Sequence, residues 1–235
     1  MSWSGGKDSA LALHQLLGDP SVDVVAVLTT ITEGYERISM HGVRVGLLRR
    51  QVASIGLPLI EVRIPPGCTN EVYESRMAEA FEDPLLISSD AMASGDIFLE
   101  DVRAYREERI RGGGKEPVFP IWGRPSVELA AASIALGFRA VITSVDPAKT
   151  GSHLCGAEFD SDFLESLPSE IDPCGENGEF HTFVYAGPFF TTPIPIRRGE
   201  LVERDGFFFR DLIGSVGMEK SLSGKERPKA RQNPQ

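Results

Sequence analysis

The sequence has few cysteines and no long apolar run. Its three cysteines, Cys68, Cys155 and Cys174, are scattered and never form a CxxC pair, so neither a disulfide framework nor a zinc cluster is expected. No stretch approaches the roughly 18 apolar residues that span a bilayer, and the start lacks a basic-then-apolar secretory signal. These absences predict a cytoplasmic protein that does not work in a membrane.

Positive charge is also scarce. The 24 Lys and Arg face 34 Asp and Glu, which gives a net charge of −10. This balance argues against a protein that binds nucleic acid by covering its phosphates. The positive charge gathers in residues 218–235, a polar segment with two prolines and no hydrophobic period. We expect that segment to be a disordered tail.

The first half of the chain alternates strand-like and helix-like segments, as in α/β proteins. Repeated βα units predict a parallel, doubly wound sheet flanked by helices. The predicted strands are Asp23–Thr32, Leu57–Ile64 and Ala91–Ile97. The predicted helices are Val45–Ile55, Asn70–Phe81 with Asn70 as its cap, and Leu99–Arg111.

The second half differs in composition, because it is rich in glycine, proline and acidic turns. A helix over Val127–Leu136 and a strand over Arg139–Ser144 could still extend the sheet. Phe180–Tyr185 and Glu203–Leu212 have the pattern of antiparallel strands. We therefore predict a first domain over residues 1–115 and a smaller α+β portion over residues 116–217.

The hexapeptide Ser4-Gly5-Gly6-Lys7-Asp8-Ser9 stands directly before an apolar helix. Glycines let backbone amides approach a polyphosphate, and the helix start adds unpaired donors and partial positive charge. Lys7 would supply a full charge, and the two serines would donate hydroxyl hydrogen bonds. Asp8 fits as a helix cap or as a ligand to Mg²⁺. The alternative is a flexible Gly-Gly turn with a surface lysine.

Five motifs together resemble one family of enzymes. SGGKDS is similar to the loop of PP-loop ATP pyrophosphatases. The stretches SMHGVR (39–44), SGDIFLED (94–101), PIWGR (120–124) and DPCGENGEFHTFV (172–184) stand in the order and spacing of the diphthine–ammonia ligase family. The resemblance runs from Ser2 to about Leu212.

This resemblance implies a Rossmann-like, HUP-type nucleotide domain with a family-specific C-terminal portion. It implies an ATP-dependent ligase that adenylates a carboxylate, releases pyrophosphate and joins ammonia to the acyl group, with ATP and Mg²⁺ in the site. In the family the acceptor is diphthine on elongation factor 2. By the same pattern residues 4–9 hold the phosphates, while Glu176 and Glu179 face the substrate or ammonia.

Two departures from the family pattern fall where the acceptor is expected. His181-Thr182 follow Phe180 where members acting on diphthine usually have Glu-Thr or Glu-Ser. Leu99-Glu100-Asp101-Val102-Arg103 replaces Ser-Asp-Tyr-Gln-Arg. We therefore expect a divergent branch whose acceptor carboxylate belongs either to a small molecule or to a protein such as elongation factor 2.

Several single residues are candidates for the site because they follow predicted strands or belong to the family motifs. Ligands of open α/β sheets collect at the carboxyl ends of strands. Asp96 is predicted to bind Mg²⁺ or the acceptor, although it could be a plain helix cap. The other candidates are His41 and Gly95 for the nucleotide, and Arg103, Arg124 and His181 for the substrate.

For most of these candidates an ordinary structural role is the alternative. His41 could be a surface loop residue, and Arg103 and Arg106, which share a helix face, could be solvated rather than clamp an acidic group. Glu176 and Glu179 would repel each other, so that one pKa rises and that group deprotonates ammonium. Otherwise they form a solvated acidic turn.

Two other functions remain open from the sequence. A PP-loop sulfur transferase acting on tRNA would want a cysteine pair and a basic surface, and the chain has neither. A non-catalytic sensor would bind ATP or AMP without turning it over. Cys174 is expected to be buried rather than nucleophilic, and a homodimer is one assembly that the sequence leaves open.

Overall fold

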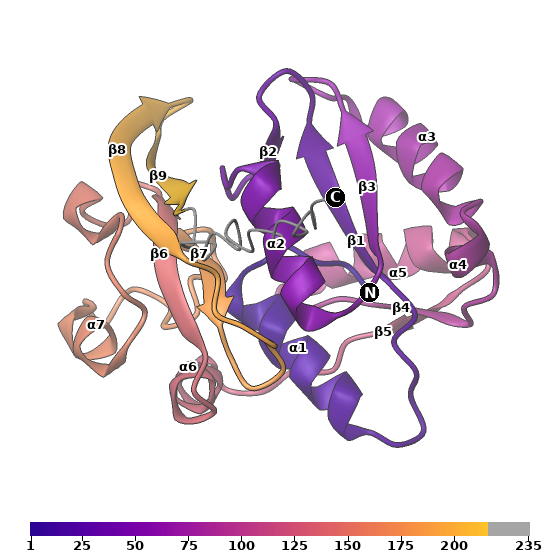
Figure 1. Cartoon of the computed structure of the whole chain (residues 1–235), viewed down its shortest axis with the longest axis horizontal. Helices are drawn as coiled ribbons and strands as arrows, with labels where there is room; N and C mark the ends of the chain where they lie inside the picture. The colour runs from indigo at the N-terminus through magenta and orange to yellow at the C-terminus, as the bar shows by residue number, and fades with distance from the viewer. Residues whose placement is uncertain (216–235) are drawn as a thin grey trace, which may run out of the picture.

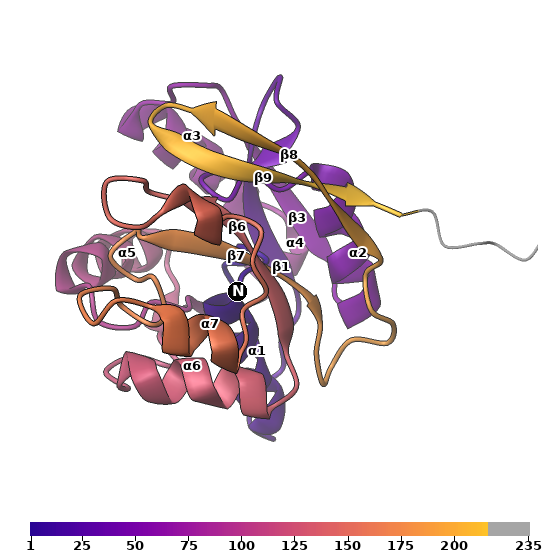
Figure 2. The ribbon, with the colours of Figure 1, turned by 90° about the vertical axis from the view of Figure 1, so that its left-hand side faces the viewer.

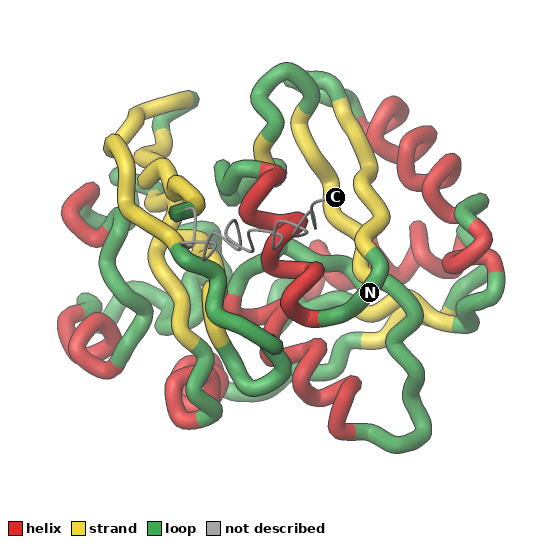
Figure 3. Tube along the Cα trace, in the orientation of Figure 1, coloured by secondary structure: helices red, strands yellow, loops and turns green. Residues whose placement is uncertain are grey.

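The computed structural model describes residues 1–215, so the tail predicted over residues 218–235 lies outside the described residues. The chain folds into two parts that lie side by side (Figure 1). The first part contains helices around parallel strands, and the second is built on an antiparallel sheet. Figure 3 shows that most helices lie in the first part.

The first part confirms the predicted α/β fold. The predicted parallel sheet is confirmed only in part, because the parallel strands lie in two small sheets. β1 (Val27–Thr32) pairs in parallel with β3 (Leu59–Ile64), while the two-residue β2 (Arg37–Ile38) pairs with β1 in antiparallel fashion. A separate parallel pair joins β4 (Ala91–Ala93) to β5 (Glu116–Val118).

The first three residues bridge these two sets of strands. Ser2 forms a parallel bridge with Leu28 of β1, and its amide donates to the carbonyl of Ala93 at the end of β4. Trp3 is 1% exposed and anchors this short segment. The strand segments therefore lie in the order β3, β1, residues 1–3, β4, β5, and the loop that follows Trp3 emerges at their carboxyl ends.

Five helices belong to this first part: α1 (Lys7–Gly18), α2 (Val45–Ile55), α3 (Asn70–Phe81), α4 (Pro84–Ile87) and α5 (Glu100–Gly112). The prediction of Asn70 as the cap of its helix is wrong. Thr69 is the N-cap, and its hydroxyl accepts a hydrogen bond from the amide of Val72. Asn70 is instead the first helical residue.

The second part consists of α6 (Ser126–Ala135), β6 (Arg139–Val145), the 3-10 turn η1 (Ser152–Leu154), α7 (Ser161–Ser166), β7 (Phe180–Ala186), β8 (Ile196–Arg204) and β9 (Phe207–Gly214). Its four strands form an antiparallel sheet in the order β7–β6–β9–β8, so the strand over residues 139–145 does not extend the parallel sheet. Figure 2 shows α6 and α7 on the same side of the molecule as this sheet.

One hydrophobic core unites the two parts, and a smaller one lies under α3 and α5. The main core includes Leu13 of α1, Leu48 of α2 and Phe183 of β7, all buried. The smaller core holds Leu28, Met92 and Ile110, and α3 covers it with half-buried side chains only. The start of α1 is therefore fixed by both parts, whereas α3 is packed more loosely.

Candidate functional site

The glycine loop, residues 4–9, is held in one conformation by its own hydrogen bonds and by β7. Gly5 has a φ of 79°, in the left-handed region that favours glycine. Its carbonyl accepts from the amide of Val184 at 2.8 Å. Ser4 Oγ accepts from the amide of Gly6 at 3.2 Å and lies 3.1 Å from Ser9 Oγ. A loop fixed in this way presents its backbone in a preset geometry.

Two backbone amides at the start of α1 have no hydrogen-bond partner among the described residues. Gly6 is the N-cap and makes no side-chain cap, and the amides of Asp8 and Ser9 precede the first intrahelical bond, which joins Ala10 to Gly6. Unpaired donors and the helix dipole together make such an end a site for anions. The prediction of Asp8 as a cap is wrong, because Asp8 lies inside the helix.

The amide of Lys7, which precedes these two amides, is capped by a side chain from the other half of the chain. The hydroxyl of Thr182 in β7 accepts from the amide of Lys7 at 3.0 Å. Thr182→Val keeps the shape and removes the acceptor, so we expect the free energy of unfolding to fall by about 1 kcal/mol, the usual cost of losing a cap. Urea denaturation measures the change. Thr182→Ser should retain wild-type stability, and equal losses in both variants would contradict the capping role.

Gly95 brings the loop after β4 into contact with the same helix start. A Cβ built on Gly95 would lie 2.9 Å from the carbonyl oxygen of Asp8 and 3.0 Å from the amide nitrogen of Ser9. Both distances are shorter than a side chain tolerates against backbone atoms. Gly95 therefore sets the position of the amides of α1, and this backbone packing is the contact that the structure assigns to it.

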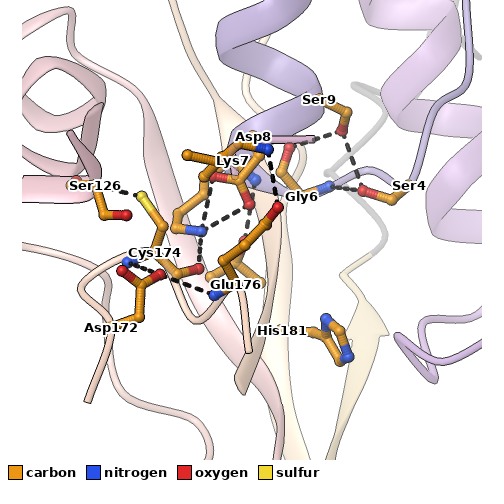
Figure 4. A network of polar contacts seen from close by, with 12 residues as sticks. Ser4, Gly6, Lys7, Asp8, Ser9, Ser126, Asp172, Cys174, Glu176 and His181 are labelled. Atoms are coloured by element: carbon orange, nitrogen blue, oxygen red, sulfur yellow. Dashed lines mark hydrogen bonds and ion pairs between the residues drawn. The ribbon is translucent and has the colours of Figure 1, made fainter. Parts of the chain in front are cut away.

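Lys7 lies on the opposite side of the loop from Ser4 (Figure 4). Its side chain is 2% exposed, and its Nζ donates to both carboxylate oxygens of Asp8, at 2.9 and 2.8 Å, and to the carbonyl of Cys174. The rings of Phe159 and Phe180 lie 5.5 and 5.6 Å from Nζ. Its charge thus balances Asp8 inside the protein.

The charges of this pair are shifted by burial and by each other. Burial works to lower the pKa of Lys7, but Asp8, Cys174 and Glu176 together outweigh it, so the pKa is raised and the lysine stays charged. Burial raises the pKa of Asp8, and Lys7 offsets part of that rise. Burial also raises the pKa of Cys174 to about 12. Cys174 is 2% exposed, which confirms the expected buried thiol.

Glu176 is the group in this cluster whose proton exchanges near neutral pH. Its Oε1 accepts from the amide of Ile97 at 2.8 Å. Burial raises the pKa of Glu176 to about 7, and the neighbouring charges of Asp8 and Asp96 add to the rise. The predicted rise is confirmed, but its predicted cause, repulsion by Glu179, is wrong.

This raised pKa makes the stability of the protein depend on pH. In the folded state Glu176 keeps its proton up to about pH 7, whereas the ordinary pKa of a glutamate side chain is 4.5. The folded state therefore binds more protons in this window, and the free energy of unfolding should fall as the pH rises through it. Below the window the contribution is fully present.

Glu176→Gln cannot lose a proton, so its stability should not fall across the same window. Urea midpoints of wild type and variant on either side of the window measure the difference. The exposed Glu170→Gln is the matched control and should keep the wild-type slope. Parallel pH profiles for wild type and Glu176→Gln would contradict the assignment.

Glu179 has a different surrounding from Glu176. It is 2% exposed, and its Oε1 accepts from the amide of Asp172 and from the side chain of Asn177. Its Oε2 is buried without a hydrogen-bond partner among the described residues. Glu179 therefore holds the turn that carries Glu176. Because Glu179 is buried, the alternative interpretation of a solvated acidic turn does not apply to it.

Asp96 lies beside this cluster and holds Arg106. The Nε of Arg106 lies 3.1 Å from Oδ1 and 3.0 Å from Oδ2 of Asp96, and Oδ2 accepts no well-aligned hydrogen bond. Asp96 is not a helix cap, because Leu99 precedes α5. Burial raises the pKa of Asp96, and Arg106 offsets part of the rise.

The protein side chains alone do not form a metal cage. Within residues 1–215 no three His, Cys, Asp or Glu side chains converge as metal ligands would. Asp8 and Asp96, the predicted Mg²⁺ ligands, each carry a cationic partner. Mg²⁺ is commonly held by one or two carboxylates together with substrate phosphates, so the two residues fit an ion that arrives with a nucleotide.

The other two predicted arginines are engaged elsewhere. The guanidinium of Arg103 lies over the rings of Phe119 and Trp122, at 5.0 and 4.6 Å, and its Nε donates to Glu107. Arg124 donates to the side-chain oxygen of Gln15, whose amide nitrogen donates to the carbonyl of Pro120. Neither lines the cavity described next.

A cavity of about 920 Å³ opens beside the loop. One group of its lining residues comes from the loop and the strand ends: Ser4, Thr29, Thr30, His41, Ser94 and His181. The other group comes from the sheet face and the helices α3 and α5: Tyr73, Met77, Phe81, Met92, Arg106 and Ile110. Of the predicted site residues Ser4, His41 and His181 therefore lie on one cavity.

His41 and His181 form a pair on the wall of this cavity. Their ring centroids are 4.5 Å apart, although the residues lie far apart in the sequence. Burial lowers the pKa of His41 to about 3 and that of His181 to about 4. Both rings are therefore neutral at physiological pH and can act as hydrogen-bond partners without adding charge.

Gln51, which was not predicted as a site residue, holds the glycine loop by hydrogen bonds. It is fully buried, and its amide donates to the carbonyls of Gly5 and Val184 and accepts from Trp3. A signal was present, because Gln51 is a polar residue on the apolar face of the predicted helix 45–55. The capping role of Thr182 had no such signal, since it depends on how β7 meets α1.

The two halves of the chain match two profiles of one family. The diphthamide synthase N-terminal domain matches residues 1–115, and the diphthamide synthase C-terminal domain matches residues 126–212. The chain belongs to the diphthamide synthase family. This confirms the resemblance drawn from the sequence motifs, and membership of the diphthamide synthase family indicates an enzyme.

No curated protein matches the chain. Across residues 1–215 no helix has the length and apolar character needed to cross a membrane. The reaction of this member of the diphthamide synthase family must therefore be argued from its own residues.

Proposed function

We propose that the chain is a cytoplasmic ATP-dependent carbon–nitrogen ligase that forms AMP and pyrophosphate. The acceptor carboxylate attacks the α-phosphorus of ATP, pyrophosphate leaves, and ammonia then displaces AMP from the acyl-adenylate. One observation carries the proposal: the unpaired amides of Asp8 and Ser9 begin a helix at the strand ends beside a cavity that Ser4 lines. The family assignment supports the same class of reaction.

In this proposal residues 1–115 form a HUP-type nucleotide-binding domain and residues 116–217 contribute to substrate binding. The loop amides and the hydroxyls of Ser4 and Ser9 bind phosphate oxygens, and His41 contacts the nucleotide. Gly95 keeps the helix start in place. Mg²⁺, held with help from Asp8 or Asp96, would neutralise charge on the phosphates. Such preorganised contacts act mainly by electrostatics and positioning.

The structure changes what we propose for Lys7 and Glu176. Because Lys7 is buried against Asp8, we propose that it orients Asp8 and the start of α1. Glu176, with its pKa of about 7, is the proposed base that takes a proton from ammonium, since a base works best near the pH of the reaction. Glu179 positions the turn, and His181 faces the acceptor.

ATP labelled at the α-phosphorus tests the reaction directly. The protein is incubated with labelled ATP, Mg²⁺, ammonium and a cell extract, and the label is followed by thin-layer chromatography. We expect labelled AMP, together with an amidated product in mass spectrometry. Release of labelled ADP would contradict attack at the α-phosphorus and overturn the proposal.

A non-catalytic sensor is the second candidate function, and one observation favours it. The charge of Lys7 is already paired with Asp8 inside the protein, so the loop can bind phosphate through amides without a free lysine to assist chemistry. A sensor would bind ATP in calorimetry and return it unchanged in the labelling assay.

A further inference from the structure

The two groups of residues around the cavity differ in chemistry. The group from the loop and strand ends is largely polar, and the proposed nucleotide lies there. The group from α3, α5 and the sheet face combines the apolar side chains of Tyr73, Met77, Phe81, Met92 and Ile110 with charged side chains at the helices, namely Glu74, Arg106, Glu108 and Arg109. At about 920 Å³ the cavity is near the upper end of roughly 300–1,000 Å³ that is typical of ligand pockets. It has room for more than the nucleotide.

The apolar residues of this group are incompletely packed. No residue of α3 is fully buried, although Tyr73, Met77 and Phe81 pack against the smaller hydrophobic core. Side chains that face a void lack contacts that a ligand with an apolar body would supply, and burying apolar surface is favourable. This part of the cavity therefore suits an apolar ligand.

Among residues 1–215 two cationic side chains line the cavity, and each has a carboxylate partner. Arg109 forms an ion pair with Glu74, at 2.9 Å, and lies over the ring of Tyr105. Arg106 is bound to Asp96 through Nε alone. Among residues 1–215 its two terminal nitrogens have no partner. A planar guanidinium fork of this kind matches a carboxylate.

Arg106 also lies close to the proposed chemistry. Asp96 holds it, and the neighbouring Gly95 touches the first turn of α1. The two histidines on the wall are neutral, and Lys7 points away from Ser4. The anion of an acceptor therefore has one cationic fork to bind beside the loop.

We infer that the acceptor is a small carboxylic acid with an apolar body, seated under α3 and α5 with its carboxylate on Arg106. This inference rests on the proposed function for the fate of the carboxylate, but the binding of the acid can be tested alone. It favours a free small molecule over a carboxylate presented by a folded protein.

Octanoate and its neutral analogue octanamide are suitable probes for calorimetric titration into the full chain. We expect octanoate to bind about tenfold or more tightly than octanamide. Arg106→Gln should weaken octanoate by about ten- to a hundredfold, the usual effect of losing a hydrogen bond to a charged group, and leave octanamide unchanged. Arg111→Gln, on the same helix but outside the cavity lining, is the matched control and should bind as wild type.

The apolar part of the pocket needs its own variant. Met77→Trp reduces the space and should weaken octanoate and octanamide alike, with its fold checked by circular dichroism. If Met77→Trp does not fold, Met77→Ala serves instead, since a larger pocket should shift the preference toward a longer acid such as dodecanoate. Unchanged affinities in both folded variants would overturn the placement under α3.

The inference and the proposed function fail in different ways. No octanoate binding, or equal binding of octanoate and octanamide, would overturn the inference even if labelled ATP yields AMP with a cell extract. Selective octanoate binding that depends on Arg106, without AMP from any acceptor, would support the pocket and overturn the ligase.

Discussion

Replacing Lys7 with alanine is expected to lower both stability and AMP formation. The change leaves the carboxylate of Asp8 without the cation that neutralises it inside the protein. Removing one partner of a buried pair usually costs about 3–5 kcal/mol. Because the Asp8 side chain is 25% exposed, we expect a loss near 3 kcal/mol in the free energy of unfolding.

AMP formation in Lys7→Ala should fall by about 10²-fold, because a displaced helix start misplaces the amides that hold the nucleotide. Urea denaturation and the labelled ATP assay measure the two effects. The matched control is the double variant Lys7→Met with Asp8→Asn, which removes the unpaired charge and should recover much of the stability. If Lys7→Ala is as stable as the wild type, the buried pair is not a structural element.

Gly95→Ala should impair nucleotide binding more than its size suggests. The added Cβ would lie 2.9 Å from the backbone of Asp8, so the start of α1 or the loop after β4 must move. Overpacking of this kind costs about 1–3 kcal/mol, and a misplacement near 1 Å can cost about 10²-fold in rate. We expect a reduction of that size in AMP formation and weaker ATP binding in calorimetry.

Gly46→Ala is the control for this substitution. Gly46 lies in α2, and a Cβ there meets nothing within 4 Å. Alanine favours the helix by roughly 0.5–1 kcal/mol relative to glycine, so this variant should be slightly more stable and fully active. Wild-type ATP binding in Gly95→Ala would show that the contact between this loop and α1 does not matter for the nucleotide.

The first part of the fold could be predicted well because its signals are local. Val45–Ile55 is helical with the predicted bounds, and it ends at Gly56 in the left-handed conformation, with a φ of 80°. Leu59–Ile64 is a strand within its predicted range. Each of these elements has its own apolar period and its own stop residue, so neighbouring residues suffice to define them.

The antiparallel sheet was predicted less well, and one turn explains much of the difference. Glu203–Leu212 was interpreted as a single strand, but Asp205 and Gly206 have φ values of 51° and 81° and join β8 to β9. An Asp-Gly pair between apolar stretches is a hairpin signal, and it marks the turn that divides this segment into two strands. The partner order β7–β6–β9–β8 depends on long-range contacts that no local pattern encodes.

For the candidate site the sequence predicted which segments meet but not which way side chains point. Ser4, His41 and His181 do line one cavity. Lys7 was expected to face the phosphates, yet it is enclosed by Asp8, Cys174 and Phe180. Cys174 and Phe180 lie more than 160 residues away in the chain, so nothing near Lys7 in the sequence indicates its burial.

The proposed function requires the amides at the start of α1 to bind a polyphosphate at the strand ends. A crystal structure with an ATP analogue carrying a methylene between the α- and β-phosphorus would locate the phosphates. We expect phosphate oxygens within hydrogen-bond distance of the amides of Asp8 and Ser9 and of the hydroxyl of Ser4, with the rest of the nucleotide in the cavity beside His41. An analogue bound elsewhere, with that helix start uncontacted, would contradict it.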